Sequence, residues 1–428
     1  MTQCEQKWHI RSTCRSCNGP NLIDVIDLGA TPLANSYLNE DQLASERSYP
    51  LKLAYCRDCT LLQMPVTIDA ELLFSEYSYL TGANEPMISH FESYARNAIR
   101  PFIHDRSDRV MDIGGNDGVL LKFVKQFCSV LNVEPAKNLR HLSESNEIEF
   151  YNAFFSSAAA EALLHQYGHP AVVTANNVFA HVDNLSDVFS GVATLVGASG
   201  VFICECHWVK NMLDIDCFDQ IYHEHLCFYS LKSLNRVIEA AGLSTFRAEV
   251  VDTQGQSLRV FASRSRKPEA SVSDLLKQES IFGLDSVEPY LEFSGRVNRK
   301  RDDVITLLKS LKSAGNTIVG YGAPAKGNTL LNYYNLGPST IEYLVDSTPL
   351  KQGRYAPGTH LKIVSPLRLH EIPPDYVLVL AWNYTDAIIE KEKDLIQRGV
   401  KFILMFPELQ VVESLSEYNA MKSRKANG

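Results

Sequence analysis

The sequence predicts an α/β protein of more than one domain, with mostly parallel sheets covered by helices on both faces. Three observations support this prediction. The chain has 428 residues, which is too long for one ordinary core. Strand-like and helix-like segments alternate along two stretches, 76–265 and 314–428, as in βαβ units. Two Cys-x-x-Cys pairs near the N-terminus indicate a small additional module.

The bulk composition is that of a globular protein with no general attraction for nucleic acid or membranes. Hydrophobic residues make up 45% of the chain and charged residues 21%, and the formal net charge is −9. An acidic chain is not drawn to phosphates or anionic lipids, so we expect neither nucleic acid nor a membrane as a partner. The sequence shows no run of 18 apolar residues and no secretion signal, so we expect a cytoplasmic location.

The first expected domain, residues 1–75, contains the two cysteine pairs. These are Cys14 with Cys17 and Cys56 with Cys59. In a reducing compartment such cysteines are metal ligands rather than disulfides. Four thiolates complete the closed tetrahedral shell that zinc takes in structural sites, and a domain with so thin a core needs this link. We therefore predict a structural Zn²⁺. A redox pair is the alternative, but redox pairs occur singly at a helix start.

The second expected domain, residues 76–265, contains one sheet. Strands are expected at 109–113, 130–134, 171–174, 200–204, 246–251 and 258–263. The last two are close in sequence, which predicts an antiparallel hairpin at one edge. Residues 266–313 have apolar residues at helical spacing and form the expected helical connector.

The last expected domain, residues 314–428, repeats the alternation. Strands are expected at 317–321, 341–346, 376–381 and 401–406, with helices at 326–334 and 387–398. This pattern predicts a second, Rossmann-like doubly wound domain.

The turn after the first strand of the second domain indicates a cofactor site. It reads Asp112-Ile-Gly-Gly-Asn-Asp-Gly118, so that Asp112, Gly114, Asn116 and Gly118 line the start of a helix. Small residues let a ligand approach the backbone, and the helix start offers free amides. A dinucleotide turn has the spacing G-x-G-x-x-G, which differs. An acid before the turn instead suits the ammonium group of S-adenosylmethionine.

Three further polar residues complete the expected cofactor site. Glu134 ends the next strand, where a carboxylate can accept hydrogen bonds from both ribose hydroxyls. Asn176 and Asn177 end the third strand, at the carboxyl edge where open sheets bind ligands. Nicotinamide enzymes share the acidic position and are the alternative. Together with the turn, these residues predict a class I, Rossmann-like S-adenosylmethionine methyltransferase core.

A cluster of titratable residues, Tyr222-His-Glu-His225, suggests acid/base chemistry. A histidine can take a proton near neutral pH, and a neighbouring carboxylate such as Glu224 can fix its tautomer. In an extended stretch Glu224 and His225 need not touch, and His223 is expected to alternate outward. A polar helix start is the alternative. His181, just beyond Asn177, is either catalytic or structural.

A second metal site is not expected. The candidate ligands His207, Cys204, Cys206 and Cys217 match no standard spacing, and strand alternation explains Cys204 and Cys206. Cys128 is expected to be a core thiol.

These motifs together resemble the sugar-nucleotide C-methyltransferases of deoxysugar pathways, which methylate carbon 3 of a nucleoside-diphosphate 4-keto-6-deoxyhexose. The resemblance covers nearly the whole chain. It rests on the cysteine pairs, the turn at 112–118, Asn177-Val-Phe-Ala-His181, Tyr222-His-Glu-His225, Gly320-Tyr-Gly-Ala-Pro-Ala-Lys-Gly-Asn-Thr329 and Trp382-Asn383. It implies that a sugar nucleotide, linked to dTDP, GDP or another nucleotide, binds between the second and last domains of a monomer or small homo-oligomer.

The resemblance also implies residue roles. His225 matches the base that removes the proton beside the ketone, and the resulting enolate attacks the methyl sulfonium. The supporting residues are Tyr222, Glu224, His181 and a tyrosine of the stretch 76–82, either Tyr77 or Tyr79; we favour Tyr79, which would also contact the substrate.

The glycine-rich turn at 320–327 suits a pyrophosphate. Lys326 and Asn328 are the candidates for the diphosphate, and Tyr321, Trp382 and Asn383 are further expected substrate contacts. A domain that serves only as a scaffold is the alternative. For the whole chain, the alternatives are an O- or N-methyltransferase acting on a sugar, an NAD-dependent sugar oxidoreductase or epimerase, and a non-enzymatic zinc module with an inactive methyltransferase fold.

Overall fold

The computed structural model describes residues 7–74, 80–83, 85–253 and 256–426, and the chain divides into two compact units. Unit 1 comprises Met1–Asp24, Ala54–Asn211 and Glu224–Pro289, and unit 2 comprises Val25–Leu53, Met212–His223 and Tyr290–Gly428. The units are defined by packing rather than by sequence order. The division into domains at 1–75, 76–265, 266–313 and 314–428 therefore stays a proposal.

Unit 1 contains a seven-stranded sheet in the order β12-β13-β10-β9-β6-β7-β8. Its strands are β6 (Arg109–Ile113), β7 (Ser129–Val133), β8 (Glu149–Tyr151), β9 (Val172–Asn176), β10 (Val201–His207), β12 (Ser244–Val251) and β13 (Ser257–Ser263). The strands from β6 to β10 pair in parallel, whereas β13 is antiparallel to both β10 and β12. The predicted α/β class and edge hairpin are confirmed. Strand β8 was not predicted, because three residues are too few to show a period.

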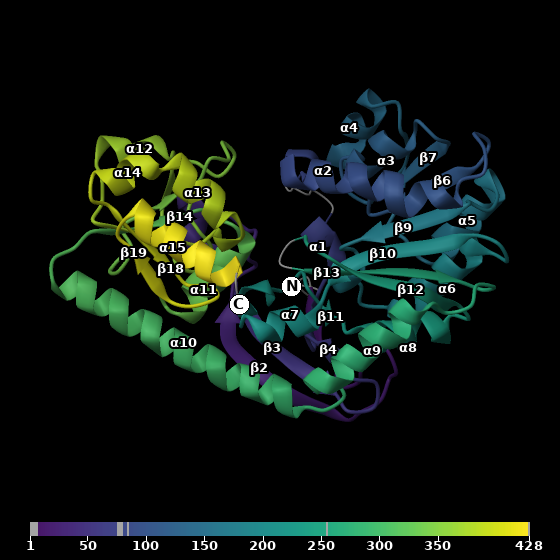
Figure 1. Cartoon of the computed structure of the whole chain (residues 1–428), viewed down its shortest axis with the longest axis horizontal. Helices are drawn as coiled ribbons and strands as arrows, with labels where there is room; N and C mark the ends of the chain where they lie inside the picture. The colour runs from purple at the N-terminus through teal and green to yellow at the C-terminus, as the bar shows by residue number, and fades with distance from the viewer. Residues whose placement is uncertain (1–6, 75–79, 84, 254–255, 427–428) are drawn as a thin grey trace, which may run out of the picture. The chain divides into compact units, whose positions relative to one another are not determined.

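Helices cover both faces of this sheet (Figure 1). Along each strand, alternate residues enter different cores: Val110 and Val172 pack in one cluster, and Met111 and Val173 in the other. The first face is covered by α2 (Glu85–Tyr94) and α3 (Val119–Val124), and the second by α5 (Ser157–Tyr167), α6 (Leu185–Val196) and α8 (Leu231–Ala240). Shorter helices are α1 (Ala70–Phe74), α4 (Arg140–Ser145) and α7 (Val209–Asp214).

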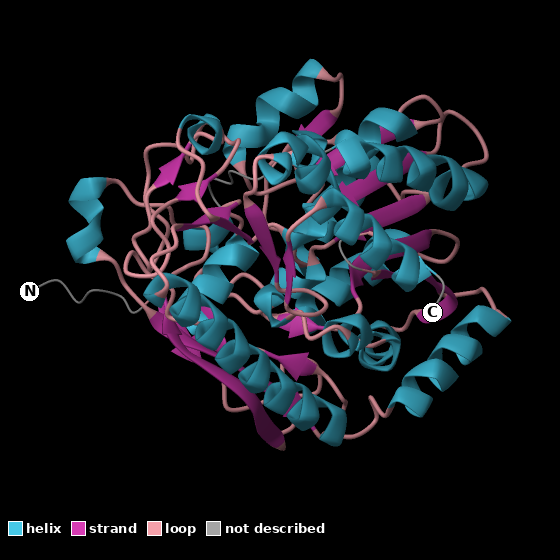
Figure 2. Cartoon of the chain, turned by 60° about the vertical axis from the view of Figure 1, so that its left-hand side comes forward, coloured by secondary structure: helices cyan, strands magenta, loops and turns pink. Residues whose placement is uncertain are grey.

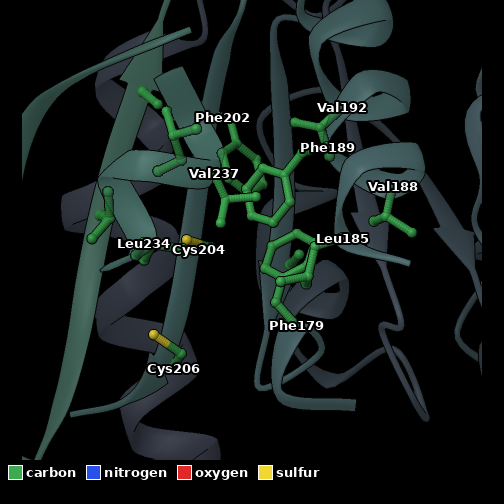
Figure 3. Packing of buried hydrophobic residues seen from close by; sticks show 14 of the residues in the cluster. Phe179, Leu185, Val188, Phe189, Val192, Phe202, Cys204, Cys206, Leu234 and Val237 are labelled. Carbon is green, nitrogen blue, oxygen red and sulfur yellow. The ribbon is translucent and has the colours of Figure 1, made fainter. Parts of the chain in front are cut away.

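Three phenylalanine rings pack among aliphatic side chains in the second core (Figure 3). The ring of Phe179 lies 4.5 Å from that of Phe189 and 5.6 Å from that of Phe202, measured between centroids. Each such fully buried ring stabilises the fold by about 1.5–3 kcal/mol. Cys204 and Cys206 belong to the same core, as strand alternation predicted, and burial raises the pKa of both thiols.

The cysteine pairs are close in sequence to two small sheets, and only Cys56 lies within a strand. One has the order β11-β4-β3-β2, from β2 (Leu22–Thr31), β3 (Tyr49–Cys56), β4 (Leu62–Gln63) and β11 (Cys227–Phe228), and the other pairs β1 (Trp8–Ile10) with β5 (Val66–Ile68). Strands β2 and β3 carry the chain from unit 1 into unit 2 and back.

Unit 2 contains a six-stranded sheet in the order β16-β15-β14-β17-β18-β19. Its strands are β14 (Ile318–Tyr321), β15 (Leu344–Val345), β16 (Ile363–Val364), β17 (Tyr376–Val379), β18 (Lys401–Leu404) and β19 (Gln410–Val412). All neighbours pair in parallel except β19, which is antiparallel to β18. The predicted doubly wound pattern is confirmed, and β16 and β19 are additional short strands.

The structure corrects one predicted helix of unit 2. The helices of this unit are α10 (Glu288–Ser313), α11 (Ala325–Tyr333), α12 (Leu367–Glu371), α13 (Thr385–Lys391), α14 (Lys393–Gln397) and α15 (Leu415–Ala426). A single helix at 387–398 was predicted, but the structure has two helices, α13 and α14, which are separated at Glu392. That carboxylate is buried, where it accepts a hydrogen bond from the Tyr321 hydroxyl (2.8 Å) and contacts His370 (2.9 Å).

The expected helical stretch 266–313 is confirmed as α9 (Ala270–Phe282) and α10, which runs without a break (Figure 2). The buried residues of α10 recur at helical spacing along one face: Tyr290, Phe293, Val297, Val304 and Leu308. Its other faces are polar. Within the described ranges, no helix combines the length and the apolar character that crossing a membrane requires.

Candidate active site

The four cysteines of the N-terminal pairs converge in unit 1. The sulfur atoms of Cys14, Cys17, Cys56 and Cys59 all lie within 4.8 Å of one another. The Sγ of Cys14 is 3.4 Å from that of Cys59, and the Sγ of Cys17 is 3.6 Å from that of Cys56. Thiolates bound tetrahedrally at about 2.3 Å from one zinc ion are separated by roughly this distance. The Gln63 amide donates to the Cys14 sulfur (3.0 Å), which stabilises a thiolate there. The residues fit a closed structural zinc site.

The glycine turn after β6 has the backbone that its sequence predicts. Gly114 has φ +64° and Gly118 φ +79°, a region that residues with a side chain rarely adopt. Gly118 is the N-cap of α3, and a Cβ atom on Gly114 would come within 2.6 Å of Val178. The turn therefore requires glycine at both positions, which leaves the backbone open to a ligand.

Two buried carboxylates flank this turn. Asp112 is 3% exposed, and its Oδ1 accepts a hydrogen bond from the Thr174 hydroxyl (2.6 Å). Burial raises the pKa of Asp112 to about 7, although the Thr174 hydroxyl opposes the rise. Glu134 accepts hydrogen bonds from the backbone amides of Asn116 (3.0 Å) and Ala136 (2.9 Å), and burial raises its pKa as well. Both acids are therefore held in fixed positions beside the turn.

A pocket lies at the carboxyl edge of the unit 1 sheet. It is lined by Thr81, Phe91, Asp112, Gly114, Gly115, Asn116, Val119, Leu120 and Asn176. The side-chain nitrogen and oxygen of Asn176 are buried there without a hydrogen-bond partner in the described part of the chain. Buried amides are normally paired, so this one indicates a polar ligand. An acid, an open turn and an unpaired amide fit S-adenosylmethionine.

The remaining predicted cofactor residues lie next to this pocket. Gly118 is the N-cap of α3 and Glu134 accepts the Asn116 amide, and neither residue lines the pocket. Asn177 has φ +56°, and its backbone amide donates to the Glu205 carbonyl (2.8 Å). Thr81 and Phe91 also line the pocket and were not predicted.

Three histidines lie together in unit 1. The ring centroid of His225 is 5.1 Å from that of His181 and 5.7 Å from that of His207. The Nδ1 of His181 lies 2.6 Å from the carbonyl oxygen of Glu224. Because a carbonyl only accepts, Nδ1 carries the proton, which leaves Nε2 as an acceptor in the neutral ring. Burial lowers the pKa of His181, which favours that neutral form. His225 and Glu224 are themselves buried.

The prediction that His223 points outward is wrong. Residues 222–224 form a bend and turn rather than an extended stretch, so side chains do not alternate there. The His223 ring is buried in unit 2, with Nε2 3.2 Å from the Pro50 carbonyl oxygen and an edge contact to Tyr49. Burial lowers the pKa of His223 to about 4. The border between the units follows this residue, so that Tyr222 belongs to unit 2 and His225 to unit 1.

Two of the residues expected to bind the substrate, both in unit 2, have a buried polar atom without a hydrogen-bond partner among the described residues. The Nζ of Lys326 is buried without a hydrogen-bond partner in the described ranges, 5.7 Å from the Trp382 ring centroid. The Trp382 indole donates to Asp219 (2.5 Å). Asn328 donates its amide to the Ala34 carbonyl (2.7 Å), while its Oδ1 has no partner among the described residues.

Other candidates are placed differently. The hydroxyl of Tyr321 is bonded to Glu392 within the core of unit 2, and Asn383 is exposed. Tyr77 and Tyr79 lie outside the described residues.

Three family models match the chain. They are described as "Putative zinc binding domain" at residues 14–74, "Methyltransferase domain" at 87–247 and "C-methyltransferase C-terminal domain" at 252–407. The parallel sheet, the turn and its pocket define an S-adenosylmethionine-dependent methyltransferase with a class I, Rossmann-like core and a zinc-binding domain.

A relative narrows this class. The C-methyltransferase NovU of Streptomyces niveus is 32% identical over 408 residues, which cover 94% of this chain and 97% of that protein. The chain belongs to this C-methyltransferase family. Membership removes the alternatives of a nicotinamide oxidoreductase and of an inactive zinc module.

Solved structures of methyltransferases are also similar to parts of the chain. Magnesium protoporphyrin IX methyltransferase of Synechocystis PCC 6803 has 14% identity and a TM-score of 0.34, covering 42% of this chain and 88% of that chain. An S-adenosylmethionine-dependent methyltransferase of Clostridium acetobutylicum has 11% identity and a TM-score of 0.34, covering 42% and 92%. At these TM-scores the likeness adds nothing to the family match.

Proposed function

We propose that this C-methyltransferase methylates carbon 3 of a nucleoside-diphosphate 4-keto-6-deoxyhexose, in the biosynthesis of a branched-chain deoxysugar. The observation that carries the proposal is the group of His181, His225 and His207, of which His225 is buried, in the same unit as the methyl-donor pocket. A carbon beside a ketone is a carbon acid, so its methylation needs a base. The resemblance to the sugar-nucleotide enzymes supports the same substrate.

His225 is the proposed base. General-base catalysis contributes about 10²–10⁴-fold, and hydrogen-bond donors to the developing enolate oxygen about a further 10²–10³-fold. His181 has its Nδ1 proton committed to the Glu224 carbonyl, which fixes the ring beside His225. Tyr222, Glu224 and Tyr79 are proposed to support the base and to donate to the enolate.

The proposed steps balance as follows. His225 takes the proton from carbon 3, and the electrons of that C–H bond form the enolate of the 4-ketone. The enolate carbon then forms a bond to the methyl carbon while the sulfur–methyl bond breaks, which leaves S-adenosylhomocysteine. His225 finally releases its proton to solvent. S-adenosylmethionine supplies the electrophilic methyl group, held by the turn at 112–118, with its ammonium at Asp112 and its ribose at Glu134.

The sugar nucleotide is proposed to use unit 2. The Lys326 ammonium is buried without a hydrogen-bond partner among the described residues, which supports a role in binding the diphosphate. The Oδ1 of Asn328 likewise has no partner among them, which supports a neighbouring contact. Trp382, Asn383 and Tyr321 belong to the same proposal, although the Tyr321 hydroxyl is already bonded. The nucleotide of the proposed substrate is dTDP, GDP or another, and a cytoplasmic location is proposed because the thiolate site needs a reducing compartment.

Hydrogen exchange at carbon 3 tests the proposed base. A panel of nucleotide 4-ketosugars is incubated with the protein in D₂O without methyl donor, and deuterium at carbon 3 is followed by NMR and product mass. We expect exchange with the wild type and at least about 10²-fold slower exchange with His225→Asn. The exposed His165→Asn is the matched control and should exchange normally. Exchange that is equally fast in His225→Asn contradicts the assignment of the base.

A further inference from the structure

The residues Asn116 and Asp117 in the cofactor turn have a second set of partners. The Oδ1 of Asn116 accepts a hydrogen bond from the backbone amide of Thr81 (3.0 Å). The Oδ2 of Asp117 accepts one from the backbone amide of Gly82 (2.7 Å). Two consecutive side chains of the turn therefore hold two consecutive amides of the segment Thr81–Ala83, a 3₁₀ turn. We call this pair of contacts the clasp.

The segment held by the clasp is one wall of the methyl-donor pocket. Thr81 itself lines the pocket, as does Phe91 of α2. Strand alternation places Asp112 on the sheet face that α2 covers, because Val110 packs in that core. The same alternation places Asn176 there, two residues beyond Thr174 and four beyond Val172. The pocket therefore lies between the strand ends and the segment at 81–94.

Helix α2, which also contributes to this wall, is held by a separate set of contacts. His90 of α2 contacts Glu205 of β10 (Nε2 to Oε2, 2.8 Å), and the other oxygen of Glu205 accepts from Arg259 (2.6 Å). The Arg259 guanidinium lies 4.3 Å from the ring centroid of Tyr94. Glu205 is only 2% exposed. This buried network holds α2 in place. The turn Thr81–Ala83, which comes before α2 in sequence, is held instead by the clasp.

The packing at the clasp is tight. A Cβ atom on Gly82 would lie 2.7 Å from Oδ2 of Asp117. Asp117 also has a helix-start contact, from the Val119 amide to Oδ1, but at 3.4 Å this bond is much the longer of the two. The geometry of Asp117 is therefore set by Gly82 rather than by α3.

We propose that Asp117, with Asn116, is a positioning residue for the methyl donor: the clasp holds Thr81–Ala83 in place as a wall of the cofactor pocket. The inference rests on the proposed cofactor site and adds a wall and a mechanism to it. Asp117 acts through the segment that it holds and does not itself line the pocket.

The first test measures binding of S-adenosylmethionine by calorimetry, with the zinc-loaded full chain. Asp117→Ala should raise the Kd about 10-fold or more, because a charge-assisted hydrogen bond is lost. Asp117→Asn keeps an oxygen that can accept from Gly82, so it should restore affinity to within about 3-fold of the wild type. Asp105→Ala removes an exposed loop acid that bonds Ser107 and is the matched control.

The second test uses the clash at Gly82 and serves even if Asp117→Ala fails to fold. Gly82→Ala should weaken binding in the wild-type background, because the new methyl group displaces Asp117. In the Asp117→Ala background the same change should cost little, so the two effects should not add. A loss of affinity that adds fully would mean that the residues act separately and would overturn the clasp.

Other outcomes separate the clasp from the proposed site. Unchanged affinity in Asp117→Ala and in Gly82→Ala, with normal binding by the wild type, would overturn the clasp alone. Equal losses in Asp117→Asn and Asp117→Ala would assign the effect to charge rather than to position and would also overturn it. If Asp112→Asn binds as tightly as the wild type, the proposed cofactor site itself fails.

Discussion

The two units contain the same local pattern with different outcomes. Each sheet has a glycine turn after one strand, a helix after the turn and an acid at the end of the next strand: Glu134 in unit 1 and Asp346 in unit 2. Both acids accept a backbone amide from their own turn, at Asn116 (3.0 Å) and at Ala323 (2.8 Å). In unit 2, however, Lys351 lies 3.7 Å from Asp346 and donates to the Ala323 carbonyl (2.8 Å).

The difference shows how a cofactor turn is distinguished from a structural one. In unit 1 the Asn176 amide is buried without a partner among the described residues, and burial raises the pKa of both acids. In unit 2 the turn is neutralised by a lysine of its own unit, and it is the Lys326 ammonium, on α11, that is buried without a hydrogen-bond partner among the described residues. Unsatisfied polar groups, rather than the glycine spacing, therefore distinguish the candidate ligand positions in the two units.

Replacing one acid in each unit by its amide should give the largest difference between the units, measured as the Kd for S-adenosylmethionine. Asp112→Asn is expected to weaken binding of S-adenosylmethionine about 100-fold, since the contact to the donor ammonium loses its charge. Asp346→Asn, the matched change in unit 2, should leave the Kd for the methyl donor unchanged and reduce only stability. Calorimetric titration checks both. Equal effects would mean that the two turns are not distinguished as described.

Replacing Lys326 or Lys351 by alanine tests which of these two lysines of unit 2 binds the substrate. Lys326→Ala should raise the KM for the sugar nucleotide about 10-fold with a smaller change in kcat, because a diphosphate contact is lost. Lys351→Ala should lower the melting temperature and leave this KM within about 2-fold, since its ammonium forms an ion pair with Asp346. Steady-state kinetics and thermal unfolding separate the two. A larger KM effect at Lys351 would reverse the assignment.

The raised pKa of Asp112 predicts a smaller, pH-dependent effect. Burial brings this pKa to about 7 in the unliganded protein, so the carboxyl group is mostly protonated at pH 6 and mostly ionised at pH 8. The donor ammonium favours the ionised form, so affinity should rise about 5- to 10-fold between pH 6 and 7.5. Calorimetry at several pH values checks this, and Asp112→Asn should abolish the rise.

The same shift predicts the opposite trend for stability. An acid whose pKa is higher in the folded protein binds more protons there than in the unfolded chain. The free energy of unfolding of the unliganded protein should therefore fall as pH rises from about 4 to about 7, and Asp112→Asn should flatten this dependence. Urea titrations across that range provide the measurement.

Much of the fold could be predicted because it depends on local patterns. Strand and helix positions follow from apolar periodicity, and the four cysteine ligands follow from their spacing. The exceptions arise from contacts that local patterns do not contain. Strand β8 is only three residues long, and the break at Glu392 depends on Tyr321, which lies 71 residues away in sequence.

The candidate site was predictable where a motif carries the chemistry. Asp112, Gly114, Asn116 and Asn176 were expected from the turn and the strand ends, and all four line one pocket. Thr81 could not be foreseen, because it joins the site through a backbone amide, which any residue type but proline would supply. His223 was misplaced because alternation was assumed where the chain turns.

The position of the transferred methyl group tests the central claim most directly. The zinc-loaded protein is given ¹³C-methyl S-adenosylmethionine and the nucleotide 4-ketosugar that it accepts, and the product is examined by carbon NMR. We predict one-bond coupling between the labelled methyl carbon and carbon 3 of a ¹³C-labelled sugar, with loss of the hydrogen at that carbon. A labelled methyl group attached to oxygen or nitrogen, with the carbon 3 hydrogen retained, would contradict the account.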